Sequence, residues 1–345
     1  MSSTPRTLYY EAAINEALCQ TMTSDPSVLL IGQGVKSPWY VGNTCTGLLE
    51  QFGEDRVIDT PVSENAITGA AVGAALAGMR PIVVHPRVDF LVYGLDPIVN
   101  EAANWHYMSG GRASVPMVVW AIINRGGEQA AQHSQSLHAW FAHVPGLKVV
   151  MPATPYDAKG LLVAAIRDDN PVIYMPDRWL NGQTGPVPEE IYEVPIGRAV
   201  VRRAGTDLTI VASSYLANEA VKAAEELAQR GIDVEVVDLR TIKPIDVETI
   251  VASTRKTGRL LAVDGGWTSF GVSAEIAAIA AERAFDALKA PVRRLALPDT
   301  PAPASRSLER AFYLHASHIV EAACDMLRAS RRSKEAPQEW QEHSR

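Results

Sequence analysis

The sequence predicts an α/β protein with two doubly wound domains, and three observations support this. Short apolar runs alternate with stretches of helical spacing along almost the whole chain. A segment rich in Pro, Gly and Glu, near residues 178–200, divides this alternation into two series. The chain has 345 residues, roughly twice the length of a common domain. Strands that alternate with helices form a parallel sheet covered on both faces.

The first series, residues 1–180, begins with apolar side chains at helical spacing over 7–23, which predict a helix. Small side chains recur over 64–79 and predict a helix that packs closely against another backbone. The other predicted helices are 94–108 and 156–167, and the predicted strands are 27–32, 81–84, 115–122, 147–151 and 172–174. Continuous apolar strands of this kind are typical of a parallel sheet buried on both faces.

The second series, residues 201–330, predicts a smaller α/β domain after a linker over 181–200. Its predicted strands are 207–212, 234–238, 260–263 and 292–296, and its predicted helices are 216–230, 246–254 and 272–287. Residues 331–345 are charged and lack apolar periodicity, which predicts a mobile tail.

Composition narrows the classes of function. Asp and Glu outnumber Lys and Arg by 39 to 32, giving a net charge of −7, so nucleic-acid binding through bulk charge is not expected. Glycine, proline or charge breaks every long apolar stretch, so no membrane span is expected. The three cysteines are far apart and form no CxxC pair, and residues 1–6 lack the apolar core of a signal peptide. We therefore expect a cytoplasmic protein.

Ligands of open α/β sheets gather at the carboxyl ends of the strands. That rule selects the loops at 32–40, 59–66, 85–90, 122–135 and 264–271. In the second of these loops, Ser63 can cap the following helix, with Glu64 complementing the helix dipole. Alternatively, Glu64 is a partly buried carboxylate that faces a ligand nitrogen.

A histidine lies in the glycine-rich loop at 126–135. His133 can move protons near neutral pH, or it is simply a solvated loop residue. His138 and His143 follow at intervals of five residues, which fit no single helix face, so a metal cluster is not expected. The loop at 264–271 lacks the GxGxxG spacing, which argues against a nicotinamide-dependent dehydrogenase.

Several strings in order along the chain resemble one family. It is the β subunit of the thiamine-diphosphate-dependent decarboxylase component of 2-oxo acid dehydrogenases, such as pyruvate dehydrogenase, in the transketolase superfamily. The resemblance covers residues 7–328. The strings are residues 59–64, 107–111, 130–135, 145–150, 165–172, 238–244 and 265–276. The resemblance implies a pyrimidine-binding domain followed by a transketolase C-terminal domain.

The resemblance also assigns residues to the cofactor. Glu64 matches the glutamate that hydrogen-bonds the aminopyrimidine ring of thiamine diphosphate and helps that ring to deprotonate the thiazolium carbon. Phe90 matches the aromatic side chain that packs on the pyrimidine, and its alternative is a plain core residue. Tyr93 stands where the family often has a glutamine, and Gln33 stands in the acidic network around the cofactor. His133 matches an active-site histidine that contacts the substrate or the acyl-transfer partner.

Partners and ions are implied as well. The family's α subunit holds the diphosphate and Mg²⁺ through a Gly-Asp-Gly string, which this chain lacks, so we expect a heterotetramer in which the chain is active only with an α subunit. The resemblance further implies a structural monovalent-cation site, K⁺ in the family. The matching residues are Met117, Ala165, Asp168 and Asn170. The alternative for Asp168 and Asn170 is the capping of a helix end.

The chain departs from the family at several positions. Gln33 replaces a glutamate, and an amide cannot carry a proton at neutral pH. Arg87 lies in a replaced segment and Arg125 is also unusual, as are Trp120 and Asn124. Either arginine can bind an anionic substrate group such as phosphate, although a solvated surface position is the more ordinary expectation.

Two functions therefore stand at the level of sequence. The first is decarboxylation of a pyruvate-like 2-oxo acid, with transfer of the acyl group to a lipoyl carrier on an acyltransferase core. The alternative is a two-subunit transketolase-like carboligase that passes a ketol or acyl group from a ketose or oxo acid to an aldehyde or sugar. A non-catalytic assembly subunit is disfavoured by the presence of Glu64, Phe90 and His133.

Overall fold

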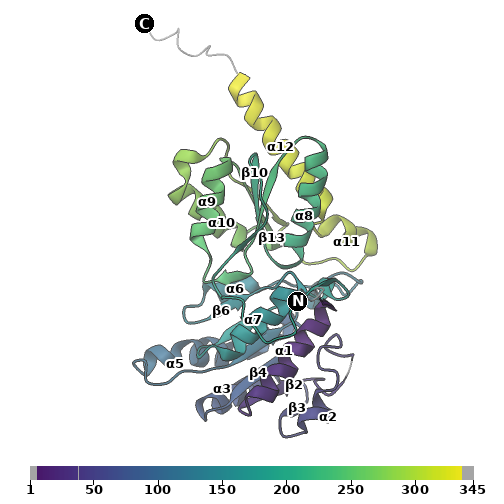
Figure 1. Cartoon of the computed structure of the whole chain (residues 1–345), viewed down its shortest axis with the longest axis vertical. Helices are drawn as coiled ribbons and strands as arrows, with labels where there is room; N and C mark the ends of the chain where they lie inside the picture. Colours follow the sequence, from purple (N-terminus) through teal and green to yellow (C-terminus); the bar gives the residue numbers. More distant parts are fainter. Residues whose placement is uncertain (1–5, 38, 336–345) are drawn as a thin grey trace, which may run out of the picture.

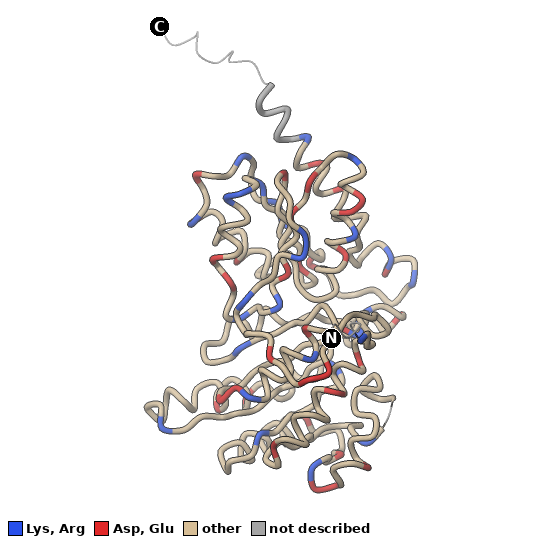
Figure 2. Tube along the Cα trace, in the orientation of Figure 1, with Lys and Arg blue, Asp and Glu red and all other residues tan. Residues whose placement is uncertain are grey.

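The computed structural model describes residues 6–37 and 39–335. Two α/β domains are stacked end to end, the first drawn in purple to teal and the second in green to yellow (Figure 1). The α/β class with two layered domains, predicted from the alternation, is confirmed. Lysines and arginines are interspersed with aspartates and glutamates over both domains (Figure 2).

A mixed sheet forms the centre of the first domain. Its strands are β2 (Val28–Gly32), β3 (Val57–Asp59), β4 (Arg80–His85), β5 (Val118–Ala121), β6 (Lys148–Val150), β7 (Val172–Tyr174) and β12 (Thr241–Lys243). In the described residues they follow the order β12-β6-β7-β5-β4-β2-β3. All neighbours pair in parallel except β12, which comes from the second domain and pairs antiparallel with β6. The second domain thus contributes an edge strand to the first.

Helices cover both faces of this sheet. They are α1 (Tyr10–Ser24), α2 (Leu48–Phe52), α3 (Glu64–Leu76), α4 (Val88–Leu91), α5 (Ala103–Met108), α6 (His138–His143) and α7 (Pro155–Arg167). Helices α1 and α7 pack side by side on one face (Figure 1). In β4, Ile82 and Val84 belong to the core under these helices, while Val83 belongs to the core under α3. This alternation follows from the two-residue period of a strand.

The second domain has its own sheet. Its strands are β9 (Val200–Arg203), β10 (Leu208–Ala212), β11 (Val234–Asp238), β13 (Leu260–Trp267) and β14 (Arg293–Leu297). Its helices are α8 (Ser214–Gln229), α9 (Val247–Thr257), α10 (Val272–Arg283), α11 (Arg306–Phe312) and α12 (Ala316–Glu335). Among the described strands the order is β14-β13-β10-β11-β9, with only β9 antiparallel. One apolar core continues from the α3 face of the first sheet to α9 and α10.

Several predicted boundaries need correction. Residues 7–9 form strand β1 (Thr7–Tyr9) rather than the start of a helix, and they pair with β8 (Thr184–Pro186) inside the predicted linker. The predicted helix at 94–108 is a π-helical turn over Pro97–Ala102 followed by α5. Pro97 has no N–H to donate, which limits an α-helix upstream of it.

Short strands were missed for a simple reason: three or four residues are too few to show a period. They are β3, β8, β9 and β12. At the other end of the chain, α12 continues to Glu335, five residues into the predicted mobile tail. The rest of that tail, 336–345, lies outside the described residues. Among the described helices, none is long and apolar enough to cross a membrane.

Candidate active site

The loops at the carboxyl ends of β2 and β4 meet the start of α3 around a pocket of about 390 Å³. All four residues predicted to contact a cofactor, Gln33, Glu64, Phe90 and Tyr93, line this one pocket. The remaining lining residues are Tyr40, Val62, Pro86 and Arg87. Parallel strands bring their carboxyl ends to the same edge of the sheet, which is why residues about 60 positions apart converge here.

Glu64 is the first residue of α3, as expected. Ser63 occupies the N-cap position, but its hydroxyl donates to the carbonyl of Val62 (2.7 Å) instead of accepting a hydrogen bond from the helix. The Glu64 carboxylate has no hydrogen-bond or ion-pair partner among the described residues. It is half-buried at the pocket wall. A carboxylate in this setting is available to a ligand that donates a hydrogen bond.

A buried hydrogen-bonded chain supports the first turn of α3. The Thr68 hydroxyl donates to the carbonyl of Glu64 (2.6 Å) and lies 3.1 Å from His85 Nε2. Because the hydroxyl proton points to that carbonyl, His85 must donate from Nε2, so its Nδ1 is bare and has no partner. Complete burial lowers the pKa of His85 to about 4. The imidazole is therefore neutral at physiological pH.

Gln33 is held within the pocket by an aromatic residue. Its Nε2 donates to the hydroxyl of Tyr40 (2.7 Å). The Tyr40 ring packs against Gly34, where an added Cβ would lie 2.0 Å from Cδ1 of the ring and where φ is +75°. Only glycine satisfies both the close approach and the left-handed backbone. The Asp59 carboxylate fixes the same turn by accepting the N–H groups of Gly34 (2.6 Å) and Val35 (3.1 Å).

His133 contacts Phe90, a residue of the pocket wall. The two rings meet edge to face with centroids 5.2 Å apart. Tyr93, by contrast, is 69% exposed at the rim. His133 does not itself line the pocket, so it lies beside the four residues predicted to contact a cofactor rather than among them.

The loop that carries His133 is anchored to the second domain. Gly126, Gly127, Glu128 and Ala130 all have positive φ. The backbone N–H of Glu128 donates to the carboxylate of Glu309 in α11 (2.9 Å). The carboxylate of Glu128 pairs with Arg306 (3.1 Å). Contacts with α11 thus help to hold the loop in a conformation in which Glu128 and Ala130 adopt positive φ, which non-glycine residues rarely do.

Arg87 joins this loop to the β4–α4 turn. Its Nη1 donates to the side chain of Gln129 and to the carbonyl of His133 (3.3 Å). It is half-buried and lines the pocket. The ordinary expectation of a solvated surface position is therefore wrong for Arg87.

Arg125 is also not a surface residue, and it does not reach the pocket. It is 8% exposed and forms an ion pair with Asp177, which is fully buried. Its guanidinium lies 5.4 Å from the Trp179 ring centroid. Trp120 is a core residue, and Asn124 donates to the carbonyl of Pro86 (3.0 Å). These residues hold the fold together, so the alternative of anion binding by Arg125 is not supported.

The three histidines of this region have different surroundings. His138 is buried, with Nε2 2.9 Å from Asp264 and Nδ1 3.1 Å from Ser136. Although burial acts to raise it, the pKa of Asp264 is lowered by His138 and by two backbone N–H groups. His143 instead faces a second cavity. Within the described ranges, no group of three or more His, Cys, Asp or Glu could hold a metal ion.

In the predicted monovalent-cation loop, Lys and Arg side chains of the chain itself already contact Asp168. The Asp168 carboxylate pairs with Lys148 and accepts the N–H of Asn170 (2.9 Å). The carbonyl of Asp168 accepts from Arg80 (3.0 Å), and that of Met117 accepts from Val172 (3.0 Å). Asp168 also ends α7, as the capping alternative expects. The monovalent-cation site stays a prediction.

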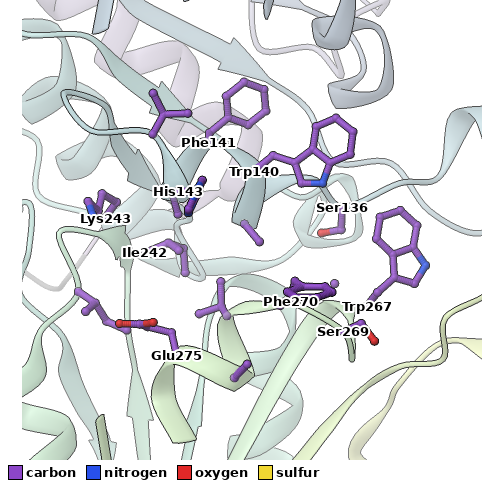
Figure 3. A pocket seen from close by; sticks show the side chains of 18 of the residues that line it. Ser136, Trp140, Phe141, His143, Ile242, Lys243, Trp267, Ser269, Phe270 and Glu275 are labelled. Atoms are coloured by element: carbon purple, nitrogen blue, oxygen red, sulfur yellow. The ribbon is translucent and has the colours of Figure 1, made fainter. Parts of the chain in front are cut away.

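A larger cavity of about 930 Å³ opens between the domains. Figure 3 shows Trp140 and Phe141 of α6 on one side and Trp267 and Phe270, at the end of β13, on the other. None of the residues predicted from the sequence to contact a cofactor or substrate lines it. Its walls are mainly apolar, so it offers few groups for proton transfer. The smaller pocket is therefore the better candidate for chemistry.

Sequence reasoning missed two residues beside the smaller pocket, Tyr40 and Arg178. Arg178 donates to the carbonyl of Tyr40 (3.1 Å). It follows the carboxyl end of β7, so the rule that selects loops after parallel strands could have found it. Its segment, however, has the Pro- and Gly-rich composition of a linker, which conceals this position in the sequence.

Comparisons with known proteins find two family models that match successive parts of the chain. Residues 6–181 match the family model described as transketolase, pyrimidine binding domain, and residues 197–319 match transketolase, C-terminal domain. The β subunit of acetoin:2,6-dichlorophenolindophenol oxidoreductase from Cupriavidus necator is 44% identical over 92% of this chain and 97% of its own length. The pyruvate dehydrogenase E1 component subunit β of Rickettsia felis is 45% identical over 90% and 95%.

A solved structure shows the same fold. It is described as a split gene transketolase, inactive beta4 tetramer, and superposes with a TM-score of 0.76. The match covers 93% of this chain and 98% of that one at 22% sequence identity.

Proposed function

The chain belongs to the transketolase family, among the β subunits of pyruvate dehydrogenase E1 and acetoin oxidoreductase, and from this we propose a thiamine-diphosphate-dependent function. The chain is the β subunit of an enzyme that decarboxylates a 2-oxo acid of the pyruvate type and passes the acyl group to a lipoyl carrier. One observation carries the proposal most directly. The Glu64 carboxylate has no partner within the chain and shares a pocket with Phe90.

The pocket fits the pyrimidine end of thiamine diphosphate. An aminopyrimidine ring is flat and carries nitrogen atoms, so it requires an aromatic or apolar wall and a hydrogen-bonding carboxylate. Phe90, Val62 and Glu64 provide these features on the walls of one pocket. In this proposal the diphosphate and Mg²⁺ sites belong to the α subunit.

Glu64 and Phe90 in the pocket, and His133 beside it, then each have a task. When bound, thiamine diphosphate supplies the nucleophilic carbon and accepts the electron pair released with CO₂. Glu64 Oε holds the proton shared with the pyrimidine nitrogen and so sets the protonation state of the ring. Phe90 orients the ring and excludes water from one side. We propose that His133, in contact with Phe90, exchanges a proton with the substrate.

A partner subunit completes the site in this proposal. The relatives are named as β subunits, which implies a second kind of chain in those proteins. The rim of the pocket is open, with Tyr93 69% exposed. An α subunit that covers this rim would bring the diphosphate and Mg²⁺ sites to Glu64, and two chains of each kind would make a heterotetramer.

The carboligase alternative is favoured by one observation. Gln33, held by Tyr40, places an amide in the pocket at the position where the family has a carboxylate. The amide can hydrogen-bond an acceptor aldehyde or sugar but cannot carry a proton. Turnover of pyruvate with ferricyanide supports the dehydrogenase function, whereas turnover only of a ketose donor with an aldehyde supports the carboligase.

The proposal is tested by calorimetry of thiamine diphosphate with Mg²⁺. The titration is made into this chain alone and into its mixture with the candidate α subunit. Tight binding in the mixture only is the expected result, and it establishes a shared site. Tight binding by this chain alone would contradict the two-subunit site, and no binding in either case would contradict thiamine diphosphate dependence.

A further inference from the structure

Two arginines beside the candidate active site lack the carboxylate partner that several other shielded arginines have. Arg125, Arg202 and Arg240 pair with Asp177, Asp238 and Asp157. Neither Arg87 nor Arg178 is within 4 Å of a carboxylate among the described residues, although both are partly shielded from solvent. We propose that Arg87, assisted by Arg178, binds a second anionic group of the substrate, a carboxylate or phosphate that is not lost in the reaction. This inference rests on the proposed function.

Arg87 has the right position for this role. It lies at the end of β4, three residues before Phe90, and lines the same pocket as Glu64. Only its Nη1 is engaged, with Gln129 and the carbonyl of His133. Its Nε and Nη2 have no partner and are not among the buried unpaired atoms, so they remain accessible. These two N–H groups form the fork that binds carboxylate or phosphate in a bidentate manner.

Arg178 strengthens the positive potential at this position. It donates to the carbonyl of Tyr40, another residue of the pocket. Burial and the nearby charge of Arg87 lower the pKa of Arg178. Two like charges that the chain does not neutralise favour an anion between them.

Asp89, an acidic group whose charge acts on Arg87, does not remove this potential. Asp89 is buried, and its Oδ1 accepts the N–H of Gln135 (3.0 Å), while its Oδ2 has no partner. Burial raises the pKa of Asp89. The Asp89 charge favours the charged form of Arg87 but makes no ion pair with it. The fork of Arg87 thus remains free for a ligand.

The chemistry of the substrate follows from this arrangement. A simple 2-oxo acid such as pyruvate has one carboxylate, which leaves as CO₂, and nothing then occupies Arg87. A substrate with a second anionic group can react at the cofactor held by Glu64 while that group pairs with Arg87. Two classes have this property: a 2-oxo acid with a distal carboxylate, and an aldehyde acceptor that carries a phosphate ester.

The test compares charged and uncharged substrates on the assembled complex of α and β subunits. One pair is 2-oxoglutarate and 2-oxobutanoate, and the other is glyceraldehyde 3-phosphate and glyceraldehyde as acceptors. We expect the wild type to prefer the charged member of one pair, which distinguishes carboxylate from phosphate. Arg87→Gln should lower kcat/KM for that member about 10- to 100-fold, mainly through KM, as expected for loss of a charge-assisted contact. The uncharged member should change little.

Matched variants separate binding from structure. Arg87→Lys should restore part of the preference, and Arg198→Gln, which breaks an exposed pair with Glu248, is the control. If Arg87 only holds the His133 loop, Arg87→Gln lowers kcat/KM equally for both members of a pair, and the inference is wrong. A wild type that prefers the uncharged members also overturns it.

A binding readout keeps the inference independent of turnover. Inorganic phosphate and malonate are titrated calorimetrically into the full chain and into its Arg87→Gln variant. Binding that the variant loses supports the anion site even if no substrate is turned over, in which case only the proposed function has failed. Equal binding by both proteins, or binding by neither, overturns the anion site whether or not the enzyme decarboxylates 2-oxo acids.

Discussion

The charged residues of the candidate active site and those of the domain junction differ in burial and in pairing. At the junction, Arg125 pairs with Asp177 and His138 with Asp264, and all four side chains are buried. In the pocket, Glu64 and Arg87 are half-buried and have no ionic partner in the described chain. The charges at the junction find their ionic partners within the chain, whereas those in the pocket require a ligand or another subunit as partner.

This difference separates stability from function. A buried charge that loses its partner destabilises the fold because it cannot recover its hydration. A half-buried charge without a partner remains hydrated, so its removal has little effect on stability. Substitutions at the junction should therefore lower the stability of the chain, and substitutions in the pocket should lower its activity.

The largest effect should come from Glu64→Gln. The amide retains the size of the side chain but cannot hold the proton of the pyrimidine nitrogen, so kcat of the assembled complex should fall about 10²- to 10⁴-fold. The thermal unfolding temperature of the chain should stay close to that of the wild type. Glu50→Gln is the matched control, because Glu50 is also a glutamate in the first turn of a helix, but an exposed one. Unchanged kcat would show that Glu64 is not catalytic.

Arg125→Met should produce the opposite result. Loss of the guanidinium leaves Asp177 as an unpaired buried charge, which costs about 3–5 kcal/mol of unfolding free energy. Denaturant unfolding measures this loss. Arg255→Met is the control, because it breaks an exposed pair with Asp286 and should cost no more than about 1 kcal/mol. Equal costs at the two positions would remove the distinction between the junction and the pocket.

Much of this arrangement could be predicted from the sequence. The alternation of strands and helices gave both domains, and the rule for strand ends selected the loops that form the pocket. Glu64, Phe90, Tyr93 and Gln33 do converge, but that expectation came from a family resemblance and not from periodicity.

The remaining features depend on contacts between distant segments. Arg125 directly precedes a glycine-rich loop in sequence and therefore looks like a surface residue, yet it is buried and pairs with Asp177, 52 positions away. Strand β12 has three residues and pairs with β6 across the domain boundary, which no local pattern indicates. Arg178 was hidden because the segment around it has the composition of a linker.

His85 offers a smaller and pH-dependent test, because it is a buried residue that supports the pocket. Burial lowers its pKa to about 4 in the folded chain, whereas an unfolded histidine titrates near 6.5. The unfolded state therefore takes up a proton first as the pH falls. The stability that neutral His85 provides is complete above about pH 6.5 and is lost as the pH falls towards 4, by about 3 kcal/mol in total.

His85→Gln removes the titrating group while keeping a donor for Thr68. The difference in unfolding free energy between wild type and variant should therefore shrink between pH 7.5 and 4, as measured by denaturant unfolding at several pH values. His106→Gln, at an exposed histidine, is the control. Parallel curves for wild type and His85→Gln would mean that His85 is not held neutral beneath α3. The hydrogen bonds from His85 through Thr68 to the Glu64 carbonyl would then not stabilise the fold as the buried ion pairs of the junction do. The contrast between buried, partnered groups and half-buried, unpartnered groups would be weaker.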